Sequence, residues 1–174
     1  MTRTLKPLLA LATLATLAPA TALAVRNVGA PLAGTVAATT YTSSGAYHGA
    51  VDIDGGTCGT TPITTGVAGS LAWNVVINTP ETLCYTALTG PQNVAKHLFA
   101  DGFTFRLMDF NRTGQTYDRT CDRCNIGAAG DAGIPANSLH LQRDKSGTKD
   151  TSWYAGYATG GEALSLGELI GVLD

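Results

Sequence analysis

The sequence predicts a mainly β fold, an antiparallel sheet with a groove and Gly-rich loops. Short segments rich in Val, Ile and Thr recur along the chain, and Gly-rich turns separate them; the chain contains 21 glycines. Strands at this spacing are typical of antiparallel domains. A hydrophobic fraction of 44% is enough for a core, and 174 residues suit one compact domain.

The first 24 residues are predicted to be a secretory signal peptide. Arg3 and Lys6 supply a positive start, residues 8–17 are an apolar stretch, and Ala22-Leu23-Ala24 fits a cleavage site. The alternative is a transmembrane anchor, but the apolar stretch is shorter than the roughly 20 residues that a span needs. We therefore expect a secreted or periplasmic bacterial protein with no stable membrane insertion after cleavage.

The mature chain is expected to begin with a lead-in over residues 25–43, which holds one edge strand near residues 34–41. The main domain then covers residues 44–174. Alternation predicts a strand over residues 47–53. Short β-type segments bounded by turn signals predict further strands over residues 61–65, 69–78, 83–88, 94–99, 103–110 and 138–143. Residues 111–137 have few apolar side chains and are expected to be a long irregular excursion. Leucines recurring over residues 161–173 predict a short C-terminal helix.

Charge and cysteine content narrow the function classes. The net charge is −2 with no basic block, which argues against nucleic-acid binding. Four cysteines in an exported chain predict two disulfides with three pairings open. We favour the pairing that joins Cys58 to Cys84 and Cys121 to Cys124. The less favoured alternatives are a redox role for Cys121 and a zinc site built from all four cysteines.

The three histidines of the chain are His48, His97 and His140. His48 and Asp52 would lie roughly 13 Å apart on a straight strand, so they can share one metal ion only if the chain bends, which Gly49 permits. His140, on a distant strand, is the natural third ligand of a catalytic zinc site. From spacing alone, a surface histidine beside a turn aspartate is the better interpretation.

The neighbouring residues change that interpretation, because together they resemble the lysostaphin-like (LytM-type) zinc metalloendopeptidases. These enzymes cut peptide cross-bridges in bacterial cell walls. The resemblance covers roughly residues 44–145 and rests on five short motifs in the family's order. They are the His-x-x-x-Asp motif at residues 48–53, the Gly-Thr-x-Pro segment at 59–69, His-Leu at 97–98, the Gly-rich segment at 126–133, and the stretch Ser-Leu-His-Leu-Gln at 138–142.

The resemblance implies a metallopeptidase-like domain with Zn²⁺ bound by His48, Asp52 and His140. It implies that the metal activates a water for attack on a peptide carbonyl, with His97 supporting the oxyanion or handling a proton. One position departs from the family: Ser138 stands where the final His-x-His motif has its first, catalytic histidine. A serine cannot replace imidazole as a general base near neutral pH, so the zinc site could survive while turnover falls.

Three hypotheses follow from the sequence. The first is a secreted zinc endopeptidase, expected to be a monomer, that acts on peptidoglycan peptide. The second is a degenerate relative that serves as a cell-wall binding or regulatory module. The third is a small disulfide-stapled structural protein with accidental motif matches.

Overall fold

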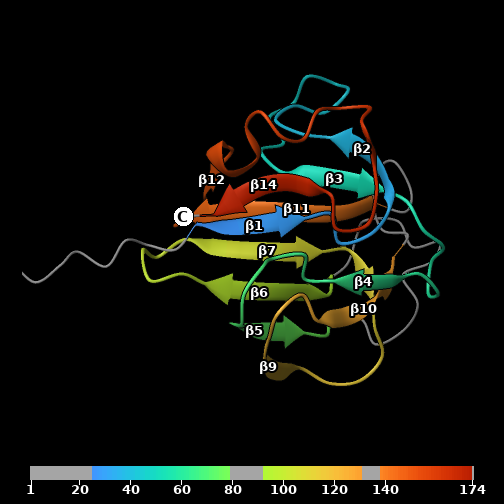
Figure 1. Cartoon of the computed structure of the whole chain (residues 1–174), viewed down its shortest axis with the longest axis vertical. Coiled ribbons are helices and arrows are strands. Elements are labelled where there is room, and N and C mark those ends of the chain that lie inside the picture. Colours follow the sequence, from blue (N-terminus) through green and yellow to red (C-terminus); the bar gives the residue numbers. More distant parts are fainter. Residues whose placement is uncertain (1–24, 79–91, 131–137, 174) are drawn as a thin grey trace, which may run out of the picture.

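The computed structural model describes residues 25–78, 92–130 and 138–173, and the expected signal peptide lies outside them. These residues form a mainly β structure with antiparallel pairing (Figure 1). Among them the only helix is the 3-10 turn Ser152–Tyr154. The strands are β1 (Arg26–Gly29), β2 (Gly34–Ala38), β3 (Val51–Asp54), β4 (Pro62–Thr64), β5 (Leu71–Val76), β6 (Val94–Leu98), β7 (Thr104–Met108), β8 (Phe110–Asn111), β9 (Tyr117–Cys121), β10 (Asn125–Ala129), β11 (Ser138–Lys145), β12 (Thr148–Asp150), β13 (Ala163–Leu164) and β14 (Leu169–Leu173).

A nine-stranded sheet dominates the structure. Its main path runs β13-β2-β3-β11-β7-β6-β5-β9, and β12 pairs with β11 outside this path. A two-stranded sheet, β1-β14, lies in front of the large sheet in Figure 1, and β4-β10-β8 form a three-stranded sheet. Residues from all three sheets belong to one hydrophobic core. The sheets therefore pack as layers around that core.

Alternation along the strands gives the large sheet two different faces. Val51, Leu141 and Leu107 are fully buried and share the face that packs on the core. Asp52 and His140, one position away, lie on the opposite face as directly paired residues. An antiparallel sheet commonly has one packed and one solvated face, and here the polar face carries the candidate chemistry.

Most expected strands are confirmed, with shifted bounds. The strand expected over residues 47–53 begins only at Val51, because Gly49 has a φ of 63° and breaks the extended run. The expected strand near residues 34–41 is β2, which lies between β13 and β3 rather than at an edge. The strand expected over residues 83–88 lies outside the described residues.

Two expectations are wrong. Residues 161–173 form β13 and β14 instead of a helix, separated by a turn in which Gly167 has a φ of 79°. β14 pairs with β1, so its backbone groups are satisfied across a sheet, and the leucine spacing only imitates a helical period. The expected irregular excursion contains β9 and β10, which pair with β5 and β4.

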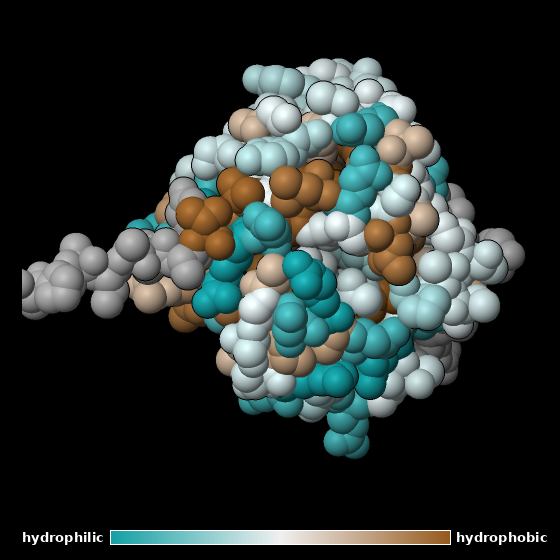
Figure 2. Space-filling view, in the orientation of Figure 1, coloured by the Kyte–Doolittle hydropathy of each residue, from teal (hydrophilic) through white to brown (hydrophobic). Residues whose placement is uncertain are grey.

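The molecular surface on the side of β1 and β14 is mixed in character. Figure 2 shows several small hydrophobic patches separated by polar residues on this face. Scattered exposed apolar residues of this kind are normal for a protein surface and do not by themselves indicate a docking site.

Candidate metal centre

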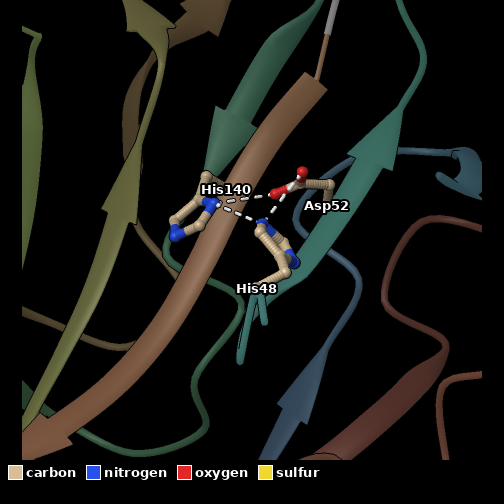
Figure 3. A group of neighbouring side chains, drawn as sticks. All are labelled: His48, Asp52 and His140. Atoms are coloured by element: carbon tan, nitrogen blue, oxygen red, sulfur yellow. Dashed lines mark hydrogen bonds and ion pairs between the residues drawn. The ribbon is translucent and has the colours of Figure 1, made fainter. Parts of the chain in front are cut away.

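Three side chains that are far apart in the sequence converge at one point of the polar face. His48 precedes β3, Asp52 lies on β3 and His140 lies on the neighbouring β11 (Figure 3). The imidazole atoms His48 Nε2 and His140 Nδ1 are 3.2 Å apart. The Asp52 carboxylate lies 2.8 Å from His140 Nδ1 and 3.2 Å from His48 Nε2. These three residues, hereafter the trio, could hold a metal ion.

The local backbone explains how the trio is assembled. Asp52 and His140 are direct partners in the β3–β11 register, so both side chains project at the same level. The turn at Gly49 then brings His48 back over this pair, and the amides of His48 and Gly49 both donate to the Thr40 carbonyl. Gly49 has a φ of 63°, a conformation that glycine adopts without strain, which favours glycine at this turn.

Hydrogen bonds on the outer side of each imidazole decide which nitrogen carries the proton. His48 Nδ1 lies 2.6 Å from the Thr39 carbonyl oxygen, which can only accept, so Nδ1 is the donor and Nε2 keeps its lone pair. His140 Nε2 lies 3.2 Å from Gln142 Oε1. Because the Gln142 amide nitrogen donates to Asp144, its oxygen accepts from His140, and Nδ1 of His140 keeps its lone pair.

Two imidazole lone pairs and a carboxylate therefore face one another in a largely buried position. The three side chains are only 12–13% exposed. Such an arrangement repels itself unless a cation lies between the donor atoms, either a proton or a metal ion. Ligand atoms on a tetrahedron with bonds of about 2.0 Å lie about 3.3 Å apart, close to the separations found within the trio. The donor geometry thus fits a metal ion.

The pKa values of His48 and Asp52 are shifted in the directions expected if a cation is stabilised between the three side chains. The hydrogen bond with Asp52 raises the pKa of His48, while partial burial opposes the change. Burial favours a higher pKa for Asp52, but hydrogen bonding with His140 and His48, when a proton occupies the space between them, outweighs burial and holds that pKa below its usual value. In the absence of a metal, His48 therefore carries a proton to a higher pH than an ordinary histidine does.

A chain of polar side chains supports His140 from outside the trio. Gln142 accepts from His140 and donates to the Asp144 carboxylate at 2.9 Å. Asp144 in turn forms an ion pair with Arg106, with a nitrogen–oxygen distance of 3.0 Å. Outer partners of this kind fix the orientation and tautomer of metal-binding histidines. Sequence reasoning missed Gln142 in this role, although it is the next residue on the same strand face as His140.

His97 is not part of this centre. Lys96 pairs with Arg106, and Arg106 pairs with Gln142, so these three residues share the face of His140. His97 is the next residue on β6 and therefore projects to the opposite face. Its Nδ1 lies 2.7 Å from the Ala72 carbonyl, and its ring packs against Trp73 and Phe99. The structure therefore does not bring His97 to the trio, where the family resemblance would put it.

Ser138 begins β11 and pairs with Asp54 in the β3–β11 register. This places its backbone two residues before His140, on the strand that supplies a trio residue.

Asp109 is a functional candidate that sequence reasoning missed. It lies between β7 and β8, is only 7% exposed, has a φ of 70°, and its Oδ1 atom has no hydrogen-bond partner. Burial raises the pKa of this carboxyl to about 7; the nearby His140 opposes the rise and Asp52 adds to it. The available sequence signal was a carboxylate between two apolar residues, Met108 and Phe110, at a strand end.

The cysteines behave in part as expected. Cys121 and Cys124 form a disulfide, with an S–S distance of 2.00 Å, across the turn between β9 and β10. Cys58 is also disulfide-bonded, and its expected partner, Cys84, lies outside the described residues. The described cysteines therefore do not form a zinc site, and the intact disulfide is compatible with an extracellular location.

Comparisons with known proteins do not assign this chain to a family. No family model matches this chain, and no curated protein matches it either. Within the residues that the structure describes, none of the helices is long and apolar enough to cross a membrane. The trio and its surroundings therefore provide the clues to what this protein does.

Proposed function

We propose that this protein is a secreted zinc-dependent hydrolase that cuts peptide bonds of bacterial peptidoglycan, as its resemblance to lysostaphin-like peptidases implies. The observation that carries the proposal is the convergence of His48, Asp52 and His140 with their unprotonated donor atoms turned inward. Three protein ligands leave one position open on a tetrahedral ion, which is the pattern of catalytic rather than structural zinc sites.

Zinc is the metal that suits this donor set best. Two neutral imidazoles and one carboxylate are ordinary zinc ligands, whereas Mg²⁺ and Ca²⁺ prefer oxygen donors alone. Export into an oxidising compartment, which the disulfides support, also favours a redox-inert ion. When bound by the trio, zinc would supply Lewis acidity that polarises a peptide carbonyl and lowers the pKa of a water molecule towards 7.

The chain's own residues would have to move the protons of the reaction. His97 faces away from the trio, so it cannot take the role that the resemblance implies. Asp109 is the better candidate, because it is a buried carboxyl with a pKa of about 7, close to the operating pH of a general base. Its free Oδ1 atom leaves one acceptor available for a proton.

A second candidate function is a zinc-binding module without turnover that binds or regulates at the cell wall. Two observations favour it: Ser138 replaces a family histidine, and His97 lies on the other face of the sheet. General acid–base catalysis contributes about 10²–10⁴-fold to a rate, so loss of both histidines would leave little activity.

Metal analysis of the purified protein tests the metal centre. We expect about one zinc per chain in the wild type, in line with a single three-ligand site. Asp52→Ala should lose that zinc, while the matched control Asp54→Ala, two residues along β3, should keep it. Wild-type protein that binds no zinc after reconstitution would refute both proposed functions.

Digestion of purified cell walls separates the two candidates. The hydrolase should release new amino groups, and Asp52→Ala should not. Zinc binding without release would instead support the module, and in that case Ser138→His should raise activity from near zero. Equal release by wild type and Asp52→Ala would refute a metal-dependent hydrolase.

A further inference from the structure

The polar face of the large sheet carries a second site next to the trio. A cavity of about 580 Å³ lies over β5, β6, β7 and β9. None of the trio residues lines it. The lining residues are Ala72, Trp73, Asn74, Lys96, His97, Leu98, Thr104, Arg106, Asp118, Arg119 and Thr120.

The strand register sets the distance between this cavity and the trio. Gln142, Arg106, Lys96 and Asn74 form one row across four adjacent strands, and the row of His140 is the next one along β11. With strands about 4.8 Å apart and rows about 6.6 Å apart, the Cα atom of Lys96 lies about 12 Å from that of His140. An extended peptide spans this distance with three to four residues, at about 3.3 Å each.

The charge of the cavity contrasts with that of the chain. The whole chain has a net charge of −2, yet three basic residues and one acidic residue line the cavity. Arg106 pairs with Asp144, which largely satisfies its charge. Within the described residues the side-chain ammonium of Lys96 has neither a hydrogen bond nor an ion pair, and this exposed side chain lines the cavity. An unpaired ammonium in a partly enclosed site is suited to bind an anion.

The remaining lining residues indicate the kind of anion. Thr104 and Thr120 offer hydroxyl groups that can bond a peptide backbone, and Leu98, 69% exposed, offers an apolar contact. The Asn74 amide nitrogen already donates to Asp118 at 2.8 Å, which leaves its carbonyl oxygen as a further acceptor. Arg119 donates to the Asn125 carbonyl at 3.3 Å, so among the described residues that line the cavity the Lys96 ammonium is the cation without any partner. A mixture of apolar contact, backbone-directed hydrogen bonds and an unpartnered ammonium suits a peptide that ends in a carboxylate better than an inorganic ion.

We propose that this cavity is a subsite for a free carboxylate of a peptide, bound by Lys96 three to four residues from the trio. The link to catalysis rests on the proposed hydrolase function, but binding at the subsite does not. Arg106 connects the two sites, because the same side chain lines the cavity and holds the Asp144–Gln142–His140 chain.

Titration with N-acetyl-trialanine, as the free acid and as its C-terminal amide, tests the subsite. Backbone amide NMR shifts are followed in the full chain, both zinc-loaded and metal-free. We expect the acid to shift amides of β6 and β7 around Lys96 in both forms and to bind more tightly than the amide. Lys96→Gln should weaken acid binding about three- to tenfold, as expected for loss of one charge-assisted hydrogen bond.

Lys145→Gln is the matched control, since it removes the same charge from a residue that does not line the cavity. An equal loss in this control, or equal binding of acid and amide, would overturn the subsite. Shifts confined to the trio of the zinc-loaded protein would also overturn it, by showing that the carboxylate goes to the metal. That result leaves the proposed zinc site standing, whereas absence of zinc binding with intact shifts at Lys96 would reject the hydrolase and keep the subsite.

Discussion

The buried Asp109 carboxyl should make the stability of the metal-free protein depend on pH, and Asp109→Asn tests this directly. Asparagine has nearly the same shape and tolerates the positive φ of 70° found at this position. The substitution therefore removes the titrating proton with little change in backbone strain. Any difference between the two proteins that varies with pH then reports the ionisation of Asp109.

The sign and size of the pH-dependent change in stability follow from the pKa of Asp109, which burial raises from an ordinary value of 3.8 to about 7. Below pH 4 the carboxyl is protonated in both the folded and unfolded states. Between pH 4 and 7 the unfolded chain releases this proton while the folded protein keeps it, so the folded state loses stability as pH rises. The shift corresponds to about 4 kcal/mol in the free energy of unfolding, all of it lost by about pH 7.

Urea unfolding followed by the fluorescence of the buried Trp73 and Trp153 is a suitable assay, run with disulfides intact and a chelator present. Relative to wild type, Asp109→Asn should gain about 1.4 kcal/mol per pH unit between pH 4 and 7. Titrations of His48 and Asp52 occur in both proteins and largely cancel in the difference. A difference that changes by less than about 1 kcal/mol over this range would refute the assignment of a buried, protonated Asp109. Zinc at the trio should move the transition to lower pH, because a nearby cation favours the carboxylate.

Three further predictions concern the metal centre and the core. Zinc at 100 times its dissociation constant should stabilise the wild type by about 2.7 kcal/mol, measured as a rise in melting temperature that is absent in Asp52→Ala. Gln142→Leu should weaken zinc binding about 10–100-fold in a competition titration, because His140 loses the acceptor that fixes its tautomer; unchanged affinity would contradict the role of Gln142. Gly171→Ala should lower the free energy of unfolding by about 1–3 kcal/mol in urea, since the new Cβ would lie 2.5 Å from the Trp153 carbonyl oxygen.

Local sequence patterns predicted the secondary structure well where one strand face is buried. Short β-type segments between turn signals identified the strands that became β5, β6, β7 and β11, because residue type and turn signals are local properties of the chain. The same reasoning was wrong for residues 161–173. Leucines in two short strands joined by a turn have nearly the spacing of a helix, and only pairing of β14 with β1 distinguishes the two.

For the candidate site too, some residues could be predicted from the sequence and others could not. Residue type suggested His48, Asp52 and His140, and the family resemblance selected them; the structure brings them within 3.2 Å of one another. His97 was placed beside them by resemblance, yet the β6–β7 register turns it to the opposite face. A shift of one residue in register exchanges the two faces of a strand, and the sequence contains no local signal for that choice.

The sequence by itself was enough to predict a β protein, the approximate position of most strands, and three residues whose side chains are suitable metal ligands. Only the tertiary structure decided which polar side chains meet, which nitrogens keep their lone pairs, and that the Oδ1 atom of buried Asp109 has no hydrogen-bond partner among the described residues. The physical reason is that residue type and alternation are local properties. Register, burial and hydrogen-bond partners arise from contacts between segments that lie up to 92 residues apart, as His48 and His140 do.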